Sequence, residues 1–211
     1  MMKVSGLDES VGLLEYATLC DGVDGRIKAA LEDFIVEEVV DSNLIQGLAC
    51  EADDLHRYAV CEMVKAGLDT FHAVRMVEQA FGRRVYYLGL KDARAKAKQY
   101  ICFSSTGLKL LDEFKVEPRV SLKLLGFYSR PISRRSLFGN RFRVKVSHVD
   151  LESFEECVSE VKSRLDEGGV PNFYGYQRFG AKRPVTHLIG RELVKRRFSD
   201  AVKLLLTYTS L

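Results

Sequence analysis

The sequence predicts an α/β protein, in which helices and strands are mixed along one chain. Apolar residues recur at every second position in some segments, as in strands, and at intervals of three or four in others, as in helices. The chain has 211 residues, of which 46% are hydrophobic and 29% charged, as in an ordinary soluble globular protein. This length is sufficient for one large domain or two small ones with a buried core.

The first half of the chain is predicted to hold three strands and two helices. The apolar residues from Leu55 to Val64 are spaced as in a helix, and Gly67 is a natural end for it. Asp69 is expected to cap the next helix. Residues 93–99 are interpreted as a single helical turn or a loop. The predicted elements are, in order, a strand, two helices and two strands, at residues 33–40, 55–67, 71–81, 85–90 and 100–104.

The second half is predicted to hold two strands followed by three helices. In the second strand, Phe142 and Val144 alternate with arginines, which indicates a half-buried strand with one basic face. His148 lies on the apolar side of this pattern and is interpreted as a core residue. Asp150 is expected to cap the first helix. The strands are predicted at residues 121–128 and 138–149, and the helices at residues 151–167 and within 183–211.

The charges are unevenly distributed, although the formal net charge is only +3. Residues 1–62 contain 14 acidic and 4 basic residues, whereas residues 118–149 contain 8 basic residues and no acidic one. Residues 170–199 contain 7 basic residues and one acidic residue. A basic half on a nearly neutral protein is typical of a polyanion-binding surface. A solvated basic face without a partner is the alternative.

The cysteines and the apolar segments bear on the cellular compartment. The five cysteines are odd in number, widely spaced and without a C-x-x-C pair, so we expect neither a disulfide framework nor a zinc site. There is no run of 18 apolar residues and no signal peptide pattern, so no membrane association is expected. These features predict a protein of the reducing cytoplasm. The P-loop, the strand-anchored G-x-G-x-x-G and H-E-x-x-H are also absent, which predicts no cofactor and no metal.

Asp92, at the end of a predicted strand, is the first candidate for chemistry. It follows the apolar residues 85–90 and lies between the cations Lys91 and Arg94. Neighbouring cations favour the ionised form of a carboxylate, which suits a nucleophile or an anchor for a cationic partner. The more ordinary interpretation is a helix N-cap, whose side chain accepts backbone hydrogen bonds. These residues alone leave both interpretations open.

The second candidate is an aromatic loop at residues 170–180. Four aromatic residues, two glycines, Asn172, Gln177 and Arg178 lie within these eleven residues. This mixture suits a loop that presents aromatic faces and amide groups to a planar ligand such as a base. A packed aromatic turn without a ligand is the alternative.

Four stretches, taken together, resemble the TruD family of pseudouridine synthases. They follow the family's order and spacing, and the resemblance extends over residues 25–211. Each is a weak signal alone, but four in order make chance similarity a poor explanation. The stretches are IKAALEDFIVEEV, GLKDARAKAKQ, LFGNRFRV and PNFYGYQRFG, at residues 27–39, 89–99, 137–144 and 171–180.

The resemblance implies a pseudouridine synthase core, with a mixed, largely antiparallel sheet and flanking helices. The implied activity is the isomerisation of a uridine in the D arm of tRNA, uridine-13 in the family, to pseudouridine. The implied partner is therefore tRNA. A base stacked in RNA has to be flipped into a pocket before such an enzyme can reach it. Phosphate contacts from basic side chains would be independent of the RNA sequence.

The resemblance also implies roles for individual residues. Asp92 corresponds to the catalytic aspartate, which attacks either the sugar or the base ring. The residues implied in binding the substrate base are Phe34, Asn172, Tyr174, Lys28 and Lys91. The residues expected to contact the RNA backbone are Arg134, Arg135, Arg141, Arg178, Lys182 and Arg183.

One departure from the family concerns length. The family has an extra domain inserted in the catalytic core, beginning near the last stretch, and the chain then returns to complete the core. We therefore expect residues 1–170 to form the N-terminal part of the core and residues 171–211 the start of the inserted domain. Exposed sheet edges and exposed apolar surface are expected as well. The alternatives are a non-catalytic RNA-binding fragment and, less in keeping with the basic charge, a small-molecule lyase or hydrolase.

Overall fold

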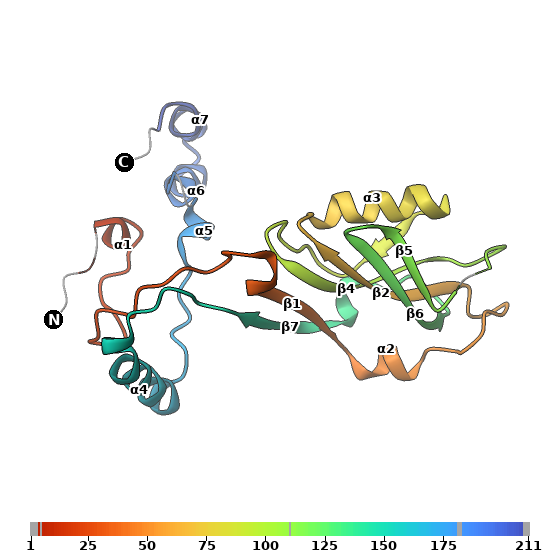
Figure 1. Ribbon diagram of the computed structural model, residues 1–211. Coiled ribbons are helices and arrows are strands. Elements are labelled where there is room, and N and C mark those ends of the chain that lie inside the picture. Colours follow the sequence, from red (N-terminus) through yellow and green to blue (C-terminus); the bar gives the residue numbers. More distant parts are fainter. Residues whose placement is uncertain (1–3, 5, 110, 181–182, 209–211) are drawn as a thin grey trace. The chain divides into compact units, whose positions relative to one another are not determined.

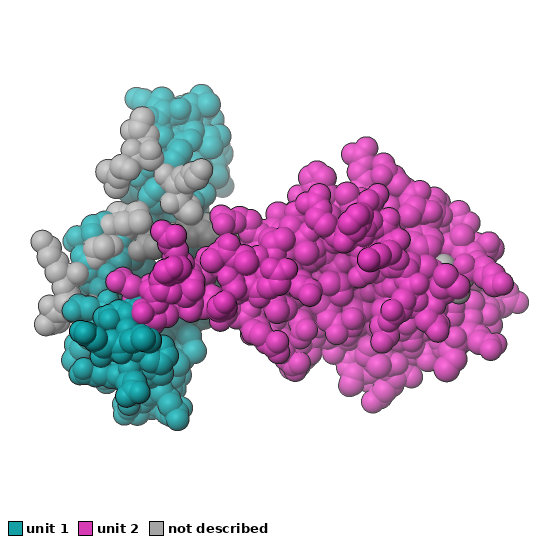
Figure 2. Space-filling model, viewed as in Figure 1, with its two compact units in different colours: residues 1–23, 150–211 teal, residues 24–149 magenta. Residues whose placement is uncertain are grey.

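A computed structural model describes residue 4 and residues 6–109, 111–180 and 183–208. The chain forms two compact units, a sheet unit of residues 24–149 and a helical unit of residues 1–23 and 150–211 (Figure 2). The predicted boundary between residues 170 and 171 falls within the helical unit, and the assignment of residues 171–211 to an inserted domain stays a prediction.

The sheet unit is built on a seven-stranded sheet within the described residues (Figure 1). Its strand order is β5-β6-β2-β4-β1-β7, and β3 also pairs with β4. The pairing of β1 with β4 is parallel, and the other pairings are antiparallel. The predicted mixed, largely antiparallel sheet is thus confirmed. The strands are β1 (Phe34–Val40), β2 (Tyr58–Ala66), β3 (Val85–Tyr87), β4 (Lys96–Ser104), β5 (Glu113–Glu117), β6 (Val120–Tyr128) and β7 (Leu137–Val144).

Helix α3 (Thr70–Phe81) covers one face of this sheet (Figure 1). Asp69 caps it by accepting a hydrogen bond from His72 N at 2.9 Å, and Gly82 ends it with a φ of 62°, which favours glycine. The buried face of α3 packs on the central strands and forms the main core. The prediction of this helix and its cap is confirmed. The core residues are Ala73, Val74 and Val77 of α3 with Ala59, Cys61, Met63, Val85, Ile101, Phe103, Val120, Leu122 and Phe127.

A smaller core lies on the opposite face, beside helix α2 (Ser42–Gln46). It contains Leu44, Val60, Leu88, Cys102 and Ile132, all of them buried. Because neighbouring residues of a strand point to opposite faces, Val60 and Cys102 belong to this core while Ala59, Cys61 and Ile101 belong to the other. Short 3-10 helices of the unit are η1 (Leu31–Asp33) and η2 (Arg134–Ser136).

The predicted helix at residues 55–67 is wrong, because this segment forms the central strand β2. Ala59, Val60, Cys61 and Met63 are all fully buried, so both faces of the strand are covered. A strand that is buried on both faces has a nearly continuous apolar sequence, which hides the alternation. Pairing with β4 on one side and β6 on the other decides the conformation.

The predicted turn or loop at residues 93–99 is wrong from Lys96 onward, where β4 begins. Charged residues are poor strand formers in isolation, but Lys98 Nζ lies 2.7 Å from Glu62 Oε2 on the neighbouring strand β2. Strand β3 is shorter than predicted, and β5 was not predicted at all. Strand β3 pairs with the second half of β4, and β5 forms a hairpin with β6, with two residues between them.

The predictions for β1 and β6 are confirmed, whereas β7 is shorter and less buried than predicted. It ends at Val144, and its side chains are mostly exposed, with Phe138 84% and Phe142 59% exposed. His148 lies beyond the strand, is exposed and has a φ of 58°, so its interpretation as a core residue is wrong. The expectation of exposed apolar surface agrees with β7.

The helical unit contains the predicted helix after Asp150 and the two predicted C-terminal helices. Asp150 caps the first of them by accepting from Glu152 N at 3.2 Å. The aromatic loop includes one short helical turn that was not predicted. The helices are α1 (Gly6–Ser10), α4 (Leu151–Gly168), α5 (Tyr176–Phe179), α6 (Thr186–Val194) and α7 (Phe198–Thr207).

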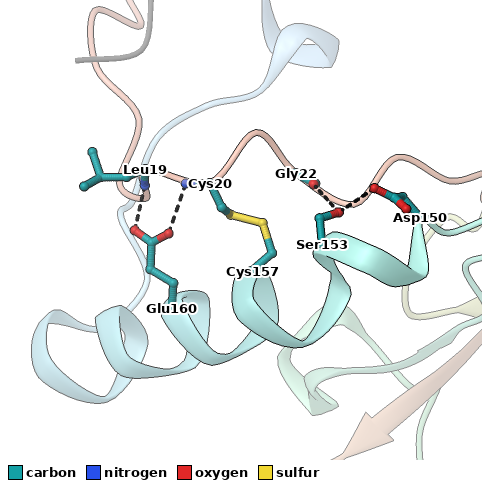
Figure 3. The surroundings of a disulfide bond; sticks show 7 residues. All are labelled: Leu19, Cys20, Gly22, Asp150, Ser153, Cys157 and Glu160. Carbon is teal, nitrogen blue, oxygen red and sulfur yellow. Dashed lines mark hydrogen bonds between the residues drawn. A yellow bond between two sulfur atoms is a disulfide. The ribbon is translucent and has the colours of Figure 1, made fainter.

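A disulfide joins Cys20 to Cys157 on α4, so the sequence-based argument against disulfides is wrong for this pair (Figure 3). The Glu160 carboxylate, one turn further along α4, accepts from Leu19 N at 2.6 Å and Cys20 N at 3.0 Å. These contacts hold the N-terminal segment along the helix and bring the two cysteine Cα atoms to 5.5 Å. The two cysteines are 137 positions apart in the sequence, so no spacing pattern could reveal the pair.

Among the described residues, no helix is long and apolar enough to cross a membrane. In the same part of the chain, no group of three or more His, Cys, Asp or Glu side chains is arranged to hold a metal ion.

Candidate functional site

Asp92 lies in the connection between β3 and β4, with its side chain 64% exposed. A strand follows it, not a helix, so the interpretation as a helix N-cap is wrong. The residues before it, Gly89 to Lys91, carry the chain from the buried Leu88 to this exposed position. The connection thus presents one carboxylate at the surface of the sheet unit, and its first residue, Leu88, is anchored in the core.

Lys28 and Phe34 lie next to this carboxylate. Lys28 Nζ donates to Asp92 Oδ2 at 3.1 Å and lies 4.1 Å from the centre of the Phe34 ring. The Lys28 side chain is 24% exposed, so the ammonium lies between the carboxylate and the aromatic face rather than in open solvent. Three residues from separate segments therefore form one polar-aromatic group, which we call the Asp92 site.

Local contacts explain why these segments meet. Lys28 has a φ of 59°, a conformation that turns the chain, and Arg94 Nη2 donates to its carbonyl oxygen at 3.3 Å. Buried Asp33 accepts from Ala30 N at 2.8 Å and so fixes the turn before β1. Phe34 begins β1 and packs edge-to-face on Phe142 of β7, with ring centres 6.2 Å apart.

Lys91 points away from the surface and forms a buried ion pair. Its Nζ lies 2.6 Å from Glu38 Oε1, and the side chains are 6% and 0% exposed. Glu38 Oε2 also accepts from Tyr100 N at 2.8 Å. A Cβ at Gly89 would lie 3.2 Å from Glu38 Oε1 and 3.1 Å from Lys91 Nζ, so glycine leaves room for the pair. The pair holds the connection, and a substrate contact by Lys91 stays a prediction.

Three further buried polar side chains bond to the main chain of the same connection. None of them was proposed as a site residue from the sequence. Lys65 Nζ donates to Asp92 O at 2.9 Å. Thr70 Oγ1 accepts from Lys91 N at 2.8 Å and donates to Gln99 Oε1 at 3.0 Å. Gln99 Nε2 donates to Gly89 O at 2.8 Å. The sequence offered one signal for this group, which was a lysine, Lys65, within an apolar segment. The interpretation of residues 55–67 as a helix placed that lysine on a helix instead of on β2.

Asn172 and Tyr174 belong to the helical unit and are both exposed. The Arg178 guanidinium lies 4.9 Å from the centre of the Tyr174 ring, which is a cation–π distance. The side chain of Tyr174 is available to a flat ligand, since the residue is 63% exposed. Their roles in a base pocket stay predictions.

Besides Arg178, which is exposed beside Tyr174, five residues are predicted to contact the RNA backbone. Arg134 and Arg135 on η2 and Arg141 on β7 are exposed. Helix η2 directly precedes β7, and β7 is the strand at one edge of the sheet. Arg183 instead donates to the carbonyl oxygens of Leu204 and Leu205, at 3.4 and 2.9 Å. Lys182 lies outside the described residues. Contact of any of these residues with RNA stays a prediction.

Comparison with known sequences gives one consistent family. The profile of the family "tRNA pseudouridine synthase D (TruD)" matches residues 10–210. The chain is 33% identical over 210 residues to "Probable tRNA pseudouridine synthase D" of Methanosarcina mazei, covering 96% of this chain and 46% of that relative. It is 34% identical over 200 residues to the protein of that name from Archaeoglobus fulgidus, covering 92% and 45%.

A solved structure is similar over nearly the whole of this chain. The crystal structure of tRNA pseudouridine synthase D (TruD) from Methanosarcina mazei matches with a TM-score of 0.76 and 30% identity, covering 95% of this chain and 45% of that chain. The present chain thus spans a little under half the length of these relatives.

Proposed function

Because the chain belongs to the TruD family of tRNA pseudouridine synthases, we propose that it carries the catalytic Asp92 of an enzyme that converts uridine-13 in the D arm of tRNA to pseudouridine. The observation that supports this proposal best is the Asp92 site. An exposed carboxylate, an ammonium at 3.1 Å from it and an aromatic ring at 4.1 Å from that ammonium form one group. The proposed location in the cytoplasm follows from the substrate and stays a prediction.

The chemistry of the isomerisation matches what this group can supply. The bond from C1′ to N1 of uracil breaks, the bond from C1′ to C5 forms, N1 gains a proton and C5 loses one. Asp92 is proposed as the nucleophile that holds the nucleoside while the uracil turns. The Lys28 ammonium keeps the carboxylate in place before the reaction, because its Nζ donates to Asp92 Oδ2.

Phe34 is proposed to pack against the uracil after the nucleotide has left the RNA stack. The ring is only half-buried, and its edge-to-face contact with Phe142 fixes its orientation. Stacking of a base on an aromatic ring contributes about 1–3 kcal/mol in single-stranded nucleic acid complexes. Part of the cost of flipping the uridine would be offset in this way.

The test uses the full 211-residue chain and an unmodified tRNA transcript, with chemical mapping of pseudouridine. The comparison is Asp92→Asn, with Asp54→Asn as the matched control because the Asp54 side chain is fully exposed and separate from the site. We expect pseudouridine at position 13 with the wild type and the control. No product is expected with Asp92→Asn, while its affinity for tRNA stays within about 3-fold of the wild type, since the loss of a carboxylate weakens no phosphate contact. Turnover by Asp92→Asn would contradict the proposal.

Binding of RNA without turnover is the second candidate function. The exposed cations on η2 and β7 support it, because they need no complete base pocket in order to contact phosphates. Salt-dependent tRNA binding by both the wild type and Asp92→Asn, with no pseudouridine from either, would favour this second function. A chain without salt-dependent affinity for tRNA would contradict both.

A further inference from the structure

Lys65 is a fully buried cation of the sheet unit. It lies near the end of β2, and its exposed fraction is 0%. Within the described part of the chain, none of the ion pairs includes its ammonium. Burial of a charge is unfavourable unless hydrogen bonds or opposite charges compensate for it. The position of Lys65 therefore needs an explanation beyond the filling of space.

The Lys65 ammonium joins two connections of the chain. It donates to Leu68 O at 2.5 Å, in the connection from β2 to α3, and to Asp92 O at 2.9 Å, in the connection from β3 to β4. Leu68 and Asp92 are thereby held by one side chain, although they are 24 residues apart in sequence. Among the described residues, no other side chain bonds to the main-chain carbonyl of Asp92.

Within the described residues, Lys65 is the side chain that holds the main chain of Asp92, whereas other side chains hold the residues before it. Gln99 holds Gly89 O, and Thr70 holds Lys91 N. On its exposed side, the Asp92 side chain accepts from Lys28 Nζ. Burial lowers the pKa of Lys65 to about 8, so the protein maintains this ammonium at a cost. A methionine would occupy a similar volume without that cost, but it could not donate to either carbonyl group.

We propose that Lys65 is a positioning residue for Asp92: its ammonium holds the main-chain carbonyl of Asp92 against the connection from β2 to α3, and so gives the exposed carboxylate one defined position beside Lys28 and Phe34. This inference rests on the proposed function, in which Asp92 carries the chemistry. Residues that fix the geometry of a reacting group affect the rate strongly, since a displacement of about 1 Å costs on the order of 100-fold.

The test compares Lys65→Met with Met63→Ala in the full chain. Met63 lies on the same strand and is equally buried, but it belongs to the core under α3 and not to the Asp92 connection. The first readout is hydrogen exchange of the Lys91 amide, which is bonded to Thr70, relative to amides inside β2 and β4. It requires neither RNA nor activity.

We expect Lys65→Met to accelerate exchange of the Lys91 amide by about 10-fold or more relative to the strand amides, because the connection opens without global unfolding. Met63→Ala should accelerate both sets by the same factor. An unchanged ratio in Lys65→Met would overturn the inference. If Lys65→Met does not fold, Lys65→Gln is used instead, because it keeps an N–H donor. It should accelerate exchange of the Lys91 amide less than Lys65→Met, and an unchanged ratio would again overturn the inference.

The second readout is turnover of the tRNA transcript. Lys65→Met should lower kcat by about 10- to 100-fold with an unchanged KM, whereas Met63→Ala should keep both values at a temperature at which it is folded. An unchanged kcat in Lys65→Met would also overturn the inference. The two proposals fail separately: no pseudouridine from the wild type counts against the proposed function, while the exchange ratio still decides the role of Lys65.

Discussion

Glu38 and Lys91 form an ion pair inside the sheet unit, with Glu38 Oε1 and Lys91 Nζ 2.6 Å apart and the two side chains 0% and 6% exposed. Through this pair, the central part of β1 is joined to the connection that presents Asp92. Glu38 also accepts from Tyr100 N, in the gap on the edge of β4 between its pairings with β1 and β3. The pair therefore contributes to both the sheet and the site.

Replacement of Glu38 by Gln should destabilise the protein strongly. The buried Lys91 ammonium would lose its counter-charge, and removal of one partner of a buried pair costs about 3–5 kcal/mol. Unfolding in urea measures this change. The double variant Glu38→Gln with Lys91→Met should recover more than half of the loss, because it buries no unpaired charge. A loss below about 1 kcal/mol in the single variant would show that the pair contributes no more than an exposed one.

The stability that depends on Lys65 should increase with pH. The pKa of Lys65 is lowered to about 8 in the folded protein, mainly by desolvation, with Lys91 acting in the same direction and Asp69 and Asp92 against it. The unfolded chain regains the ordinary pKa of 10.5 and holds more protons between these two values, so the free energy of unfolding rises with pH in that range.

We expect the rise to be about 1–2 kcal/mol between pH 8 and 10.5, less than the full shift implies, because the folded protein relaxes around a buried charge and so lowers its desolvation penalty. The measurement is urea unfolding at several pH values in the wild type and in Lys65→Met. Taking the difference between the two proteins cancels the titration of all other groups. A difference that stays constant or falls over this range would contradict the assigned pKa shift.

The cysteines should react with a thiol reagent in three distinct steps. Cys50 is free and exposed, so it should be labelled in the folded protein. Burial raises the pKa of Cys61 to about 12 and that of Cys102 to about 11, and the thiolate is the reactive form. Both should therefore react only after unfolding. Cys20 and Cys157 should require reduction first.

Mass spectrometry after alkylation counts the modified thiols at each step. Three rapidly labelled thiols in the folded protein would contradict the burial of Cys61 and Cys102. Labelling of Cys20 and Cys157 without a reductant would contradict the disulfide. Cys50→Ser serves as the control, since it should remove the first step alone.

Removal of the exposed arginines at one edge of the sheet should weaken tRNA binding in a salt-dependent way. Replacement of Arg134, Arg135 or Arg141 by Ala should reduce the slope of log K against log salt concentration by about 0.7–0.9 for every phosphate that the arginine neutralises. The control is Lys115→Ala with Lys123→Ala, which removes exposed cations from β5 and β6 at the other end of the strand order. Equal slopes in both sets would assign the binding to another surface.

The sequence predicted those helices and strands whose caps, terminating glycines or apolar alternation lie within a few residues of each other. The cap at Asp69 and the glycine at Gly82 define α3, and the cap at Asp150 defines α4, because a capping side chain bonds to amides two or three residues away. The alternation from Phe34 onward likewise predicted β1, which has one register within the sheet. The family resemblance, and with it the choice of Asp92, also came from short local stretches.

Tertiary structure decided the features that depend on distant partners. The segment from Tyr58 to Ala66 has apolar residues on both sides, so only its pairing with β4 and β6 makes it a strand. The Cys20–Cys157 disulfide depends on the packing of the N-terminal segment along α4. The contact of Lys65 with Asp92 O joins residues 27 positions apart. The sequence by itself indicated Asp92 as the carboxylate to single out, because its neighbours and the motif around it lie within one short stretch. The side chains that hold its connection between β3 and β4 come from distant segments, and only the folded sheet brings them together.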